Sequence, residues 1–171
     1  MANKYIVSLC LSLLSASTSP VYALSDASLN ISANIVASPC IVNNSTIDGK
    51  VALGRFFTNQ LRNPGDATQW VSFSLELNSC PQQTTKVVVD FKGEPYPTRE
   101  NLFSNSGGST QVAIEVADVQ GGAISNESTR EIKVDALHNA ILPLKSRMVT
   151  PEGNATSGSV SGTIEVSFAY Q

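Results

Sequence analysis

The stretch that decides the fold reads Val160-Ser161-Gly162-Thr163-Ile164-Glu165-Val166-Ser167-Phe168-Ala169-Tyr170. Apolar residues and one glycine take the even positions, and polar or small residues take the odd positions. Successive side chains of a β-strand point to opposite faces. This period of two therefore predicts a strand with one face in a core and the other in water.

The same alternation recurs along the chain, whereas helical periodicity is scarce. Segments 71–77, 87–91 and 112–116 alternate clearly, and shorter candidates lie at 132–134 and 141–144. Within the last of these, Pro143 predicts an edge strand or a bulge, because proline cannot donate to a β-ladder. Turn-forming residues separate the segments at 93–97, 106–109 and 120–122. Several short strands joined by turns predict an all-β protein, a β-sandwich.

A further alternating segment lies near the N-terminus, ahead of Cys40. Its apolar positions are Ala27, Leu29, Ile31, Ala33 and Ile35. Such a terminal strand either forms an ordinary first strand of the same domain or is offered to another molecule. An exposed apolar edge otherwise promotes aggregation.

The first residues predict a secretory signal peptide with cleavage after Ala23. Lys4 precedes the apolar run 6–14, and small or apolar residues follow at 21–23. The run is shorter than the roughly 18 residues that a membrane-spanning helix needs. Lipidation of Cys10 is disfavoured, because Leu9 precedes it where a small residue is needed.

Cleavage after Ala23 leaves two cysteines, Cys40 and Cys80, in a compartment that permits oxidation. The simplest reading is one disulfide, with Cα atoms within about 7 Å of each other. Closing a loop of this length contributes about 4 kcal/mol on a chain-entropy estimate. A metal role is disfavoured, because His138 is the single histidine and no Cys-x-x-Cys motif is present.

The composition argues against several classes of function. The formal net charge of −3 gives no basic excess for a nucleic-acid partner. The sequence has no nucleophile elbow, and Gly107-Gly108 is read as a turn in preference to a phosphate cradle. Glu115 and Asp118 are three residues apart on a strand and so face opposite sides. We predict no catalytic residues, no cofactor, no metal and no small-molecule substrate.

The chain resembles the fimbrial subunits of the chaperone–usher pathway, most closely the minor adaptor subunits of type 1 fimbriae. The resemblance covers the chain after the signal peptide and rests on segments in a fixed order: Ala37-Ser38-Pro39-Cys40, Val51-Ala52-Leu53-Gly54, 73–80, 87–93 and the terminal alternation. Its sharpest element is a glycine 14 residues from the end with a tyrosine next to last. Gly158 and Tyr170 occupy these positions.

The resemblance implies an incomplete immunoglobulin-like β-sandwich that lacks its last strand and is completed by donor-strand exchange. A periplasmic chaperone would first fill the open groove with a strand of its own, and the N-terminal extension of a neighbouring fimbrial subunit would replace it at an outer-membrane usher. The implied divisions are a signal peptide (1–23), a donor-strand extension (24–38) and a pilin domain (39–171). The chain would be exported through the periplasm into an extracellular fimbrium that supports cell adhesion.

The resemblance also assigns roles to residues. The donor side chains would be Ala27, Leu29, Ile31, Ala33 and Ile35, and Ala33 stands where the family often has glycine, which bears on partner choice. The strand that the chaperone pairs with would contain Gly158, Val160, Gly162, Ile164, Val166, Phe168 and Tyr170.

A different class, a secreted carbohydrate- or protein-binding module, stays open at this point. Trp70, Tyr96 and Phe103 are aromatic residues that could line a sugar site. A two-domain tip adhesin would need about twice this length and no donor extension. The sequence leaves open whether the chain is an adaptor or the repeating rod subunit, and which fimbria and host receptor it serves.

Overall fold

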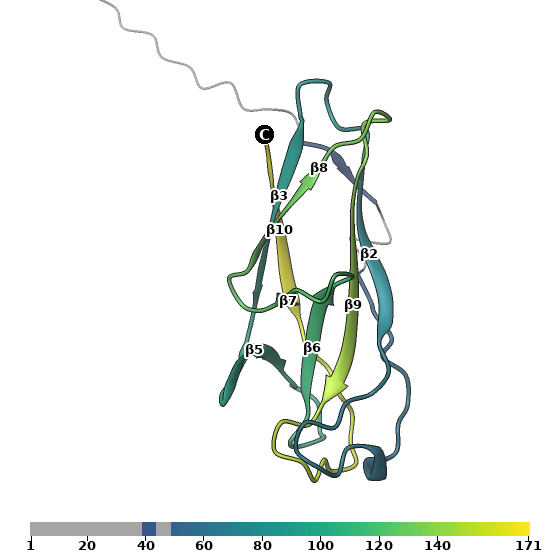
Figure 1. Ribbon diagram of the computed structural model, residues 1–171, viewed down its shortest axis with the longest axis vertical. Coiled ribbons are helices and arrows are strands. Elements are labelled where there is room, and N and C mark those ends of the chain that lie inside the picture. Colours follow the sequence, from purple (N-terminus) through teal and green to yellow (C-terminus); the bar gives the residue numbers. More distant parts are fainter. Residues whose placement is uncertain (1–38, 44–48) are drawn as a thin grey trace, which may run out of the picture. The chain divides into compact units, whose positions relative to one another are not determined.

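The computed structural model describes residues 39–43 and 49–171, which fold into two antiparallel β-sheets (Figure 1). One sheet has the strand order β1-β2-β9-β6-β5-β4 with β7 added to β6, and the other has the order β10-β3-β8. The strand bounds are β1 Ile41–Val42, β2 Val71–Asn78, β3 Lys86–Gly93, β4 Pro95–Tyr96, β5 Arg99–Ser104, β6 Ala113–Asp118, β7 Ala123–Ile124, β8 Thr129–Lys133, β9 Ala140–Val149 and β10 Ile164–Tyr170. A single 3-10 turn, η1, spans Thr58–Gln60.

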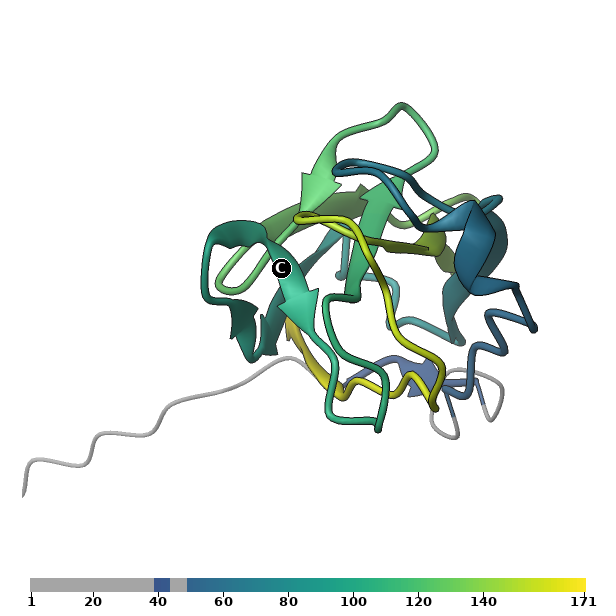
Figure 2. The ribbon, with the colours of Figure 1, turned by 90° about the horizontal axis from the view of Figure 1, so that it is seen from below.

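The core lies between the sheets, which surround it when viewed along the strands (Figure 2). The side chains that the alternation predicts to face inward are buried on β2, β3, β6 and β9. They include Leu75, Leu77, Val87, Val89, Phe91, Ile114, Val116, Leu142 and Leu144. Full burial of such a side chain contributes about 1.5–3 kcal/mol, so this layer supplies most of the drive to fold. The predicted all-β sandwich is confirmed.

The predicted disulfide between Cys40 and Cys80 is present. The two Cα atoms lie 4.2 Å apart, and both residues are buried. The bond ties the residue before β1 to the end of β2, next to the pairing of Ile41 with Asn78. It therefore fixes the point at which the N-terminal residues join the sandwich.

The edge position predicted from Pro143 is wrong for the strand as a whole. β9 pairs with β2 on one side and β6 on the other, and Pro143 lies opposite Ser74 without a shift in register. Along β9, the ladder with β6 begins at Leu144, one residue after the proline. Pro143 thus lies where β9 has only β2 as a partner, so its lack of an N–H breaks no ladder on the β6 side.

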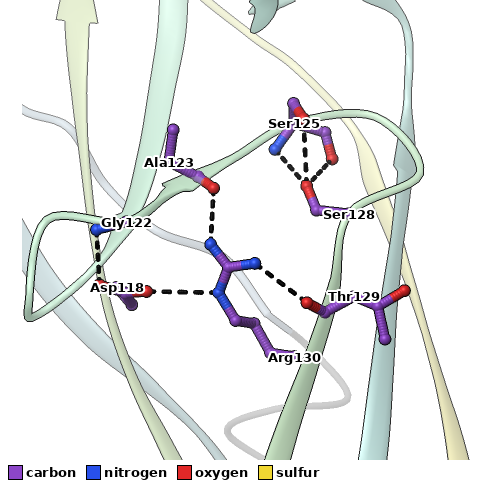
Figure 3. Close-up of polar contacts among 7 residues, drawn as sticks. All are labelled: Asp118, Gly122, Ala123, Ser125, Ser128, Thr129 and Arg130. Atoms are coloured by element: carbon purple, nitrogen blue, oxygen red, sulfur yellow. Dashed lines mark hydrogen bonds and ion pairs between the residues drawn. The ribbon is translucent and has the colours of Figure 1, made fainter.

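Arg130 of β8 ties together the turns that connect β6, β7 and β8 (Figure 3). Its guanidinium donates to the Asp118 carboxylate at 3.3 Å, to the Ala123 carbonyl at 2.7 Å and to the Thr129 carbonyl at 2.9 Å. The Gly122 N–H donates to the other Asp118 oxygen at 2.7 Å. Burial disfavours the charged carboxylate, but these hydrogen bonds outweigh it and hold the pKa of Asp118 below its ordinary value.

We expect the Arg130→Gln variant to lose about 1–2 kcal/mol of stability at neutral pH, because it removes the bond to the largely buried Asp118 carboxylate and two bonds to main-chain carbonyls. Since the folded-state pKa of Asp118 is lowered, the contribution is present above the unfolded pKa and is lost as the pH falls through the folded pKa. Urea unfolding at pH 7 and below pH 4 measures this. The difference from wild type should shrink in acid, and a difference equal at both pH values would contradict the assignment. Lys86→Gln, which breaks the exposed pair with Glu131, is the matched control and should cost under about 0.5 kcal/mol.

Candidate strand-docking groove

β10 is an edge strand with an open groove beside it. Its only ladder among the described residues is with β3, and β1 forms the corresponding edge of the other sheet. The groove has a volume of about 1980 Å³ and is lined by strands of both sheets and by the segment 49–58. Its apolar lining includes Val42, Leu53, Phe56, Phe73, Leu75, Phe91, Ile114, Val116, Leu144, Met148, Ile164, Val166 and Phe168. The sandwich is therefore open along one side.

The inward side chains of β10 are only half-buried. Ile164, Val166, Phe168 and Tyr170 pack against the core, yet none of them is fully enclosed. The residues of β3 that face the same core, Val87 and Val89, are completely buried. Burial still suffices to raise the pKa of the Tyr170 hydroxyl above its ordinary value. In the part of the chain that the structure describes, no further strand covers the core layer on the β10 side.

The main chain of β10 is open along the same side. The Gln171 N–H donates to the Lys86 carbonyl, and the Lys86 N–H donates back, each at 3.0 Å. In an antiparallel pair the main-chain groups of successive residues alternate in direction, so the odd residues of β10 bond to β3. The even residues direct their N–H and C=O groups toward the groove. Ile164 to Tyr170 thus offer both apolar side chains and a ladder to an incoming strand.

The predicted strand from Val160 begins only at Ile164, but the extended edge continues further back. Ser159 and Ser161 bond to the 105–109 loop in place of β3. The Ser106 N–H donates to the Ser161 carbonyl at 2.8 Å, and the Ser109 N–H donates to the Ser159 carbonyl at 3.0 Å. The extended chain therefore continues back to Ser159, with Val160 and Gly162 ahead of the even residues of β10. We call the segment 158–170 the acceptor edge.

Close packing requires a glycine at position 158 of the acceptor edge. A Cβ at Gly158 would lie 2.8 Å from the Cα of Ser109 and nearer still to its backbone nitrogen. Any larger residue there would push the edge away from the 105–109 loop. A Cβ at Gly162 would lie 2.6 Å from Cδ1 of Ile114, the end of a side chain that can move aside.

The opposite wall of the groove comes from the segment 49–58. Leu53 and Phe56 of this segment pack on a small cluster formed by Leu61, Val112, Met148 and Ala155. The sequence pointed to Leu53 only through a family-like motif, and it gave no signal for Phe56 or Met148. Their role depends on long-range packing, which no local pattern records.

The aromatic residues of the alternative sugar site do not come together. Phe103 is 1% exposed in the core, and the Tyr96 hydroxyl donates to the Glu152 carboxylate at 2.6 Å. Burial, and then the hydrogen bond and negative charge of Glu152, raise the pKa of Tyr96 to about 12. Trp70 lies under the cations of Lys145 and Arg147, at 4.9 and 4.3 Å from the ring centroid. These three residues form no common binding site.

The remaining predictions fall in part beyond what the structure covers. Residues 27–35 lie outside the described residues. His138 lies in the turn between β8 and β9, with a positive φ of 61°. Within 39–43 and 49–171, no three His, Cys, Asp or Glu side chains are grouped to hold a metal ion. No helix in these ranges is long and apolar enough to cross a membrane.

Among the described residues, the chain is a sandwich whose edge strand β10 lacks a second partner along an apolar groove, an arrangement to which an extended strand can add. The chain belongs to the fimbrial protein family, whose model matches residues 29–171. It is 32% identical over 147 residues to the uncharacterized fimbrial-like protein YdeR of Escherichia coli K12, covering 85% of this chain and 86% of that protein. It is 30% identical to protein FimG of the same strain, covering 85% of each chain.

The fold is also that of solved pilus subunits. The crystal structure of the P pilus rod subunit PapA superimposes with a TM-score of 0.67 at 16% identity, covering 78% of this chain and all of that one. The protein is thus a structural fimbrial subunit, and the predicted incomplete immunoglobulin-like sandwich is confirmed.

Proposed function

We propose that the chain is a fibre-internal subunit that is assembled by donor-strand exchange. Its acceptor edge first receives a strand of a periplasmic chaperone and then, at an outer-membrane usher, the N-terminal extension of a neighbouring subunit. Its own extension, residues 24–38, enters the groove of another subunit. The observation that carries this proposal is that the acceptor edge presents side chains and main-chain groups along the same open side.

The dimensions of the two partners support this pairing. The extension 24–38 and the acceptor edge 158–170 are of similar length. Every ladder among the described strands is antiparallel. An antiparallel strand would form its hydrogen-bonded pairs opposite the even residues of β10, with its own side chains pointing into the groove.

The expected free energy is large for a domain of this size. Burial of five small to medium apolar side chains contributes on the order of 5 kcal/mol. Each main-chain hydrogen bond adds about 0.5–1.5 kcal/mol. Since small domains are stable by only about 5–15 kcal/mol, an empty groove leaves the subunit poorly stable and prone to aggregate.

We further propose that the chain is no enzyme and that it acts outside the cell, after removal of residues 1–23 and passage through the periplasm. The groove lining supports a structural role, because it is built of aliphatic and aromatic side chains and of hydroxyls. Its charged residues are Lys50 and Arg55 of the segment 49–58 and Glu76 of β2.

A synthetic peptide of residues 24–38 tests the proposal. Added to the subunit without chaperone, it should produce a cooperative unfolding transition at a temperature that rises with peptide concentration. A peptide of the same composition in scrambled order is the control and should have no effect. A subunit that unfolds cooperatively alone, at a temperature that the peptide does not change, would contradict the proposal.

A further inference from the structure

Large exposed apolar side chains gather at one pole of the sandwich, beside the disulfide. Ile41 is 63% exposed, Leu137 is 79% exposed and Ile141 is 54% exposed. The ladders place them at the same end of the sheet, because Ile41 and Ile141 lie opposite Asn78 and Glu76 at the end of β2, and the Cys80 N–H donates to the carbonyl of His138 in the turn that holds Leu137. We call these three residues the disulfide-pole face.

A fourth such side chain, Phe57, lies at the opposite pole. It is 78% exposed and precedes η1, where its N–H donates to Oε1 of Gln60 at 3.0 Å. The chain beyond η1 is held to the start of the acceptor edge, because the Ala155 N–H donates to the Leu61 carbonyl at 3.1 Å. Figure 1 shows η1 at the lower end of the sandwich, and β1 and the turn between β8 and β9 at the upper end.

We propose that the disulfide-pole face of one copy packs against the Phe57 pole of a second copy. The inference rests on the proposed function, because the inserted extension brings the two poles together. An antiparallel extension begins opposite Tyr170 and ends near Gly158, at the Phe57 pole of the acceptor. Ile41 follows Ile35 by six residues, so it lies within about 20 Å of the inserted strand. The donor's disulfide pole is therefore held next to the acceptor's Phe57 pole.

The geometry of this contact suits a fibre. The two surfaces are different and lie at opposite ends of the same chain, so each copy can use both at once. Such head-to-tail contacts generate open filaments when the rotation from one copy to the next does not close a ring. A face of three side chains is too small to hold two free subunits together. Once the extension is inserted, the two poles are held at a high local concentration. Even this small contact can then fix the orientation of one copy relative to the next.

Cysteine cross-linking tests the contact directly. The Phe57→Cys/Leu137→Cys variant of the chain from residue 24 should form a ladder of extension-linked copies. Mild oxidation should then join neighbouring copies covalently. Phe57→Cys/Val119→Cys is the control, since Val119 is 48% exposed in the turn between β6 and β7, away from both poles. Cross-linking that is no faster than in this control would overturn the inference.

A second measurement separates this contact from the groove itself. Phe57→Asp and Leu137→Asp should each speed dissociation of the ladder by about tenfold, and the double variant should add little more. Phe57 also lines the groove, so Leu137→Asp is the variant that separates the two sites. Leu137→Asp should leave the affinity for the free 24–38 peptide unaltered, because the peptide carries the extension without the pole. Equal weakening of the peptide complex by Leu137→Asp would overturn the inference. A wild-type chain that forms no ladder would instead contradict the proposed function, whatever the variants do.

Discussion

An Ile31→Asp subunit should fold and accept a strand normally but fail to insert its own extension into another subunit. Ile31 is the middle one of the five donor positions, so its side chain would enter the centre of the apolar groove. A carboxylate there would lose its water without gaining a partner, which costs several kcal/mol. We expect insertion to fall by at least a hundredfold, measured as ladder formation when variant and wild-type copies are mixed.

The matched control for this change is Asn30→Asp, which places the same charge on the adjacent, outward face of the extension. It should insert at nearly the wild-type rate, because its side chain stays in water. The extension is either a donor strand for another subunit or the first strand of its own domain. The unfolding transition of the Ile31→Asp variant with the 24–38 peptide bound distinguishes these two roles. If Ile31→Asp lowers that transition, the extension is the first strand of its own domain, and the donor role is wrong.

The fold follows from the sequence where the apolar residues of a strand alternate clearly, whereas β9, Ala140–Val149, was predicted only over 141–144. β2, β3, β6 and β10 each alternate over several residues, so the period of two fixed both their presence and their inward residues. β4 and β7 have only two residues each and are too short to show a period. β5 carries Arg99, Glu100 and Asn101 at its start, so only Leu102 and Phe103 are buried and no alternation appears.

The groove was predictable on one side only. The acceptor edge lies on a single strand, where alternation and the Gly158 and Tyr170 spacing identify it. The facing wall comes from the segment 49–58, which has no regular structure apart from the start of η1. Pro143 misled the prediction for a related reason. A proline excludes a ladder on one side of its own position, whereas the strand's neighbours are set by pairing along its whole length.

Replacing Cys40 and Cys80 with serine should cost the subunit about 4 kcal/mol of stability with the groove filled. The bond closes a loop of 40 residues, and its loss restores the conformational freedom of that loop to the unfolded chain. Loss of the bond should also loosen the attachment of β1 to β2. β1 has only two residues, and the bond from the Asn43 N–H to the Glu76 carbonyl at 3.0 Å extends its pairing with β2 by only one residue.

Urea unfolding in saturating 24–38 peptide measures this loss, and the peptide affinity of the same variant reports on the groove. Affinity should fall too, because β1 carries Val42, which lines the groove. Dithiothreitol should lower the stability of the wild type by the same amount and leave the serine variant unchanged, which separates loss of the bond from the effect of the new side chains. A loss under about 1 kcal/mol would mean that strand pairing alone holds β1 in place. The disulfide would then contribute little to the wall against which the donor strand packs.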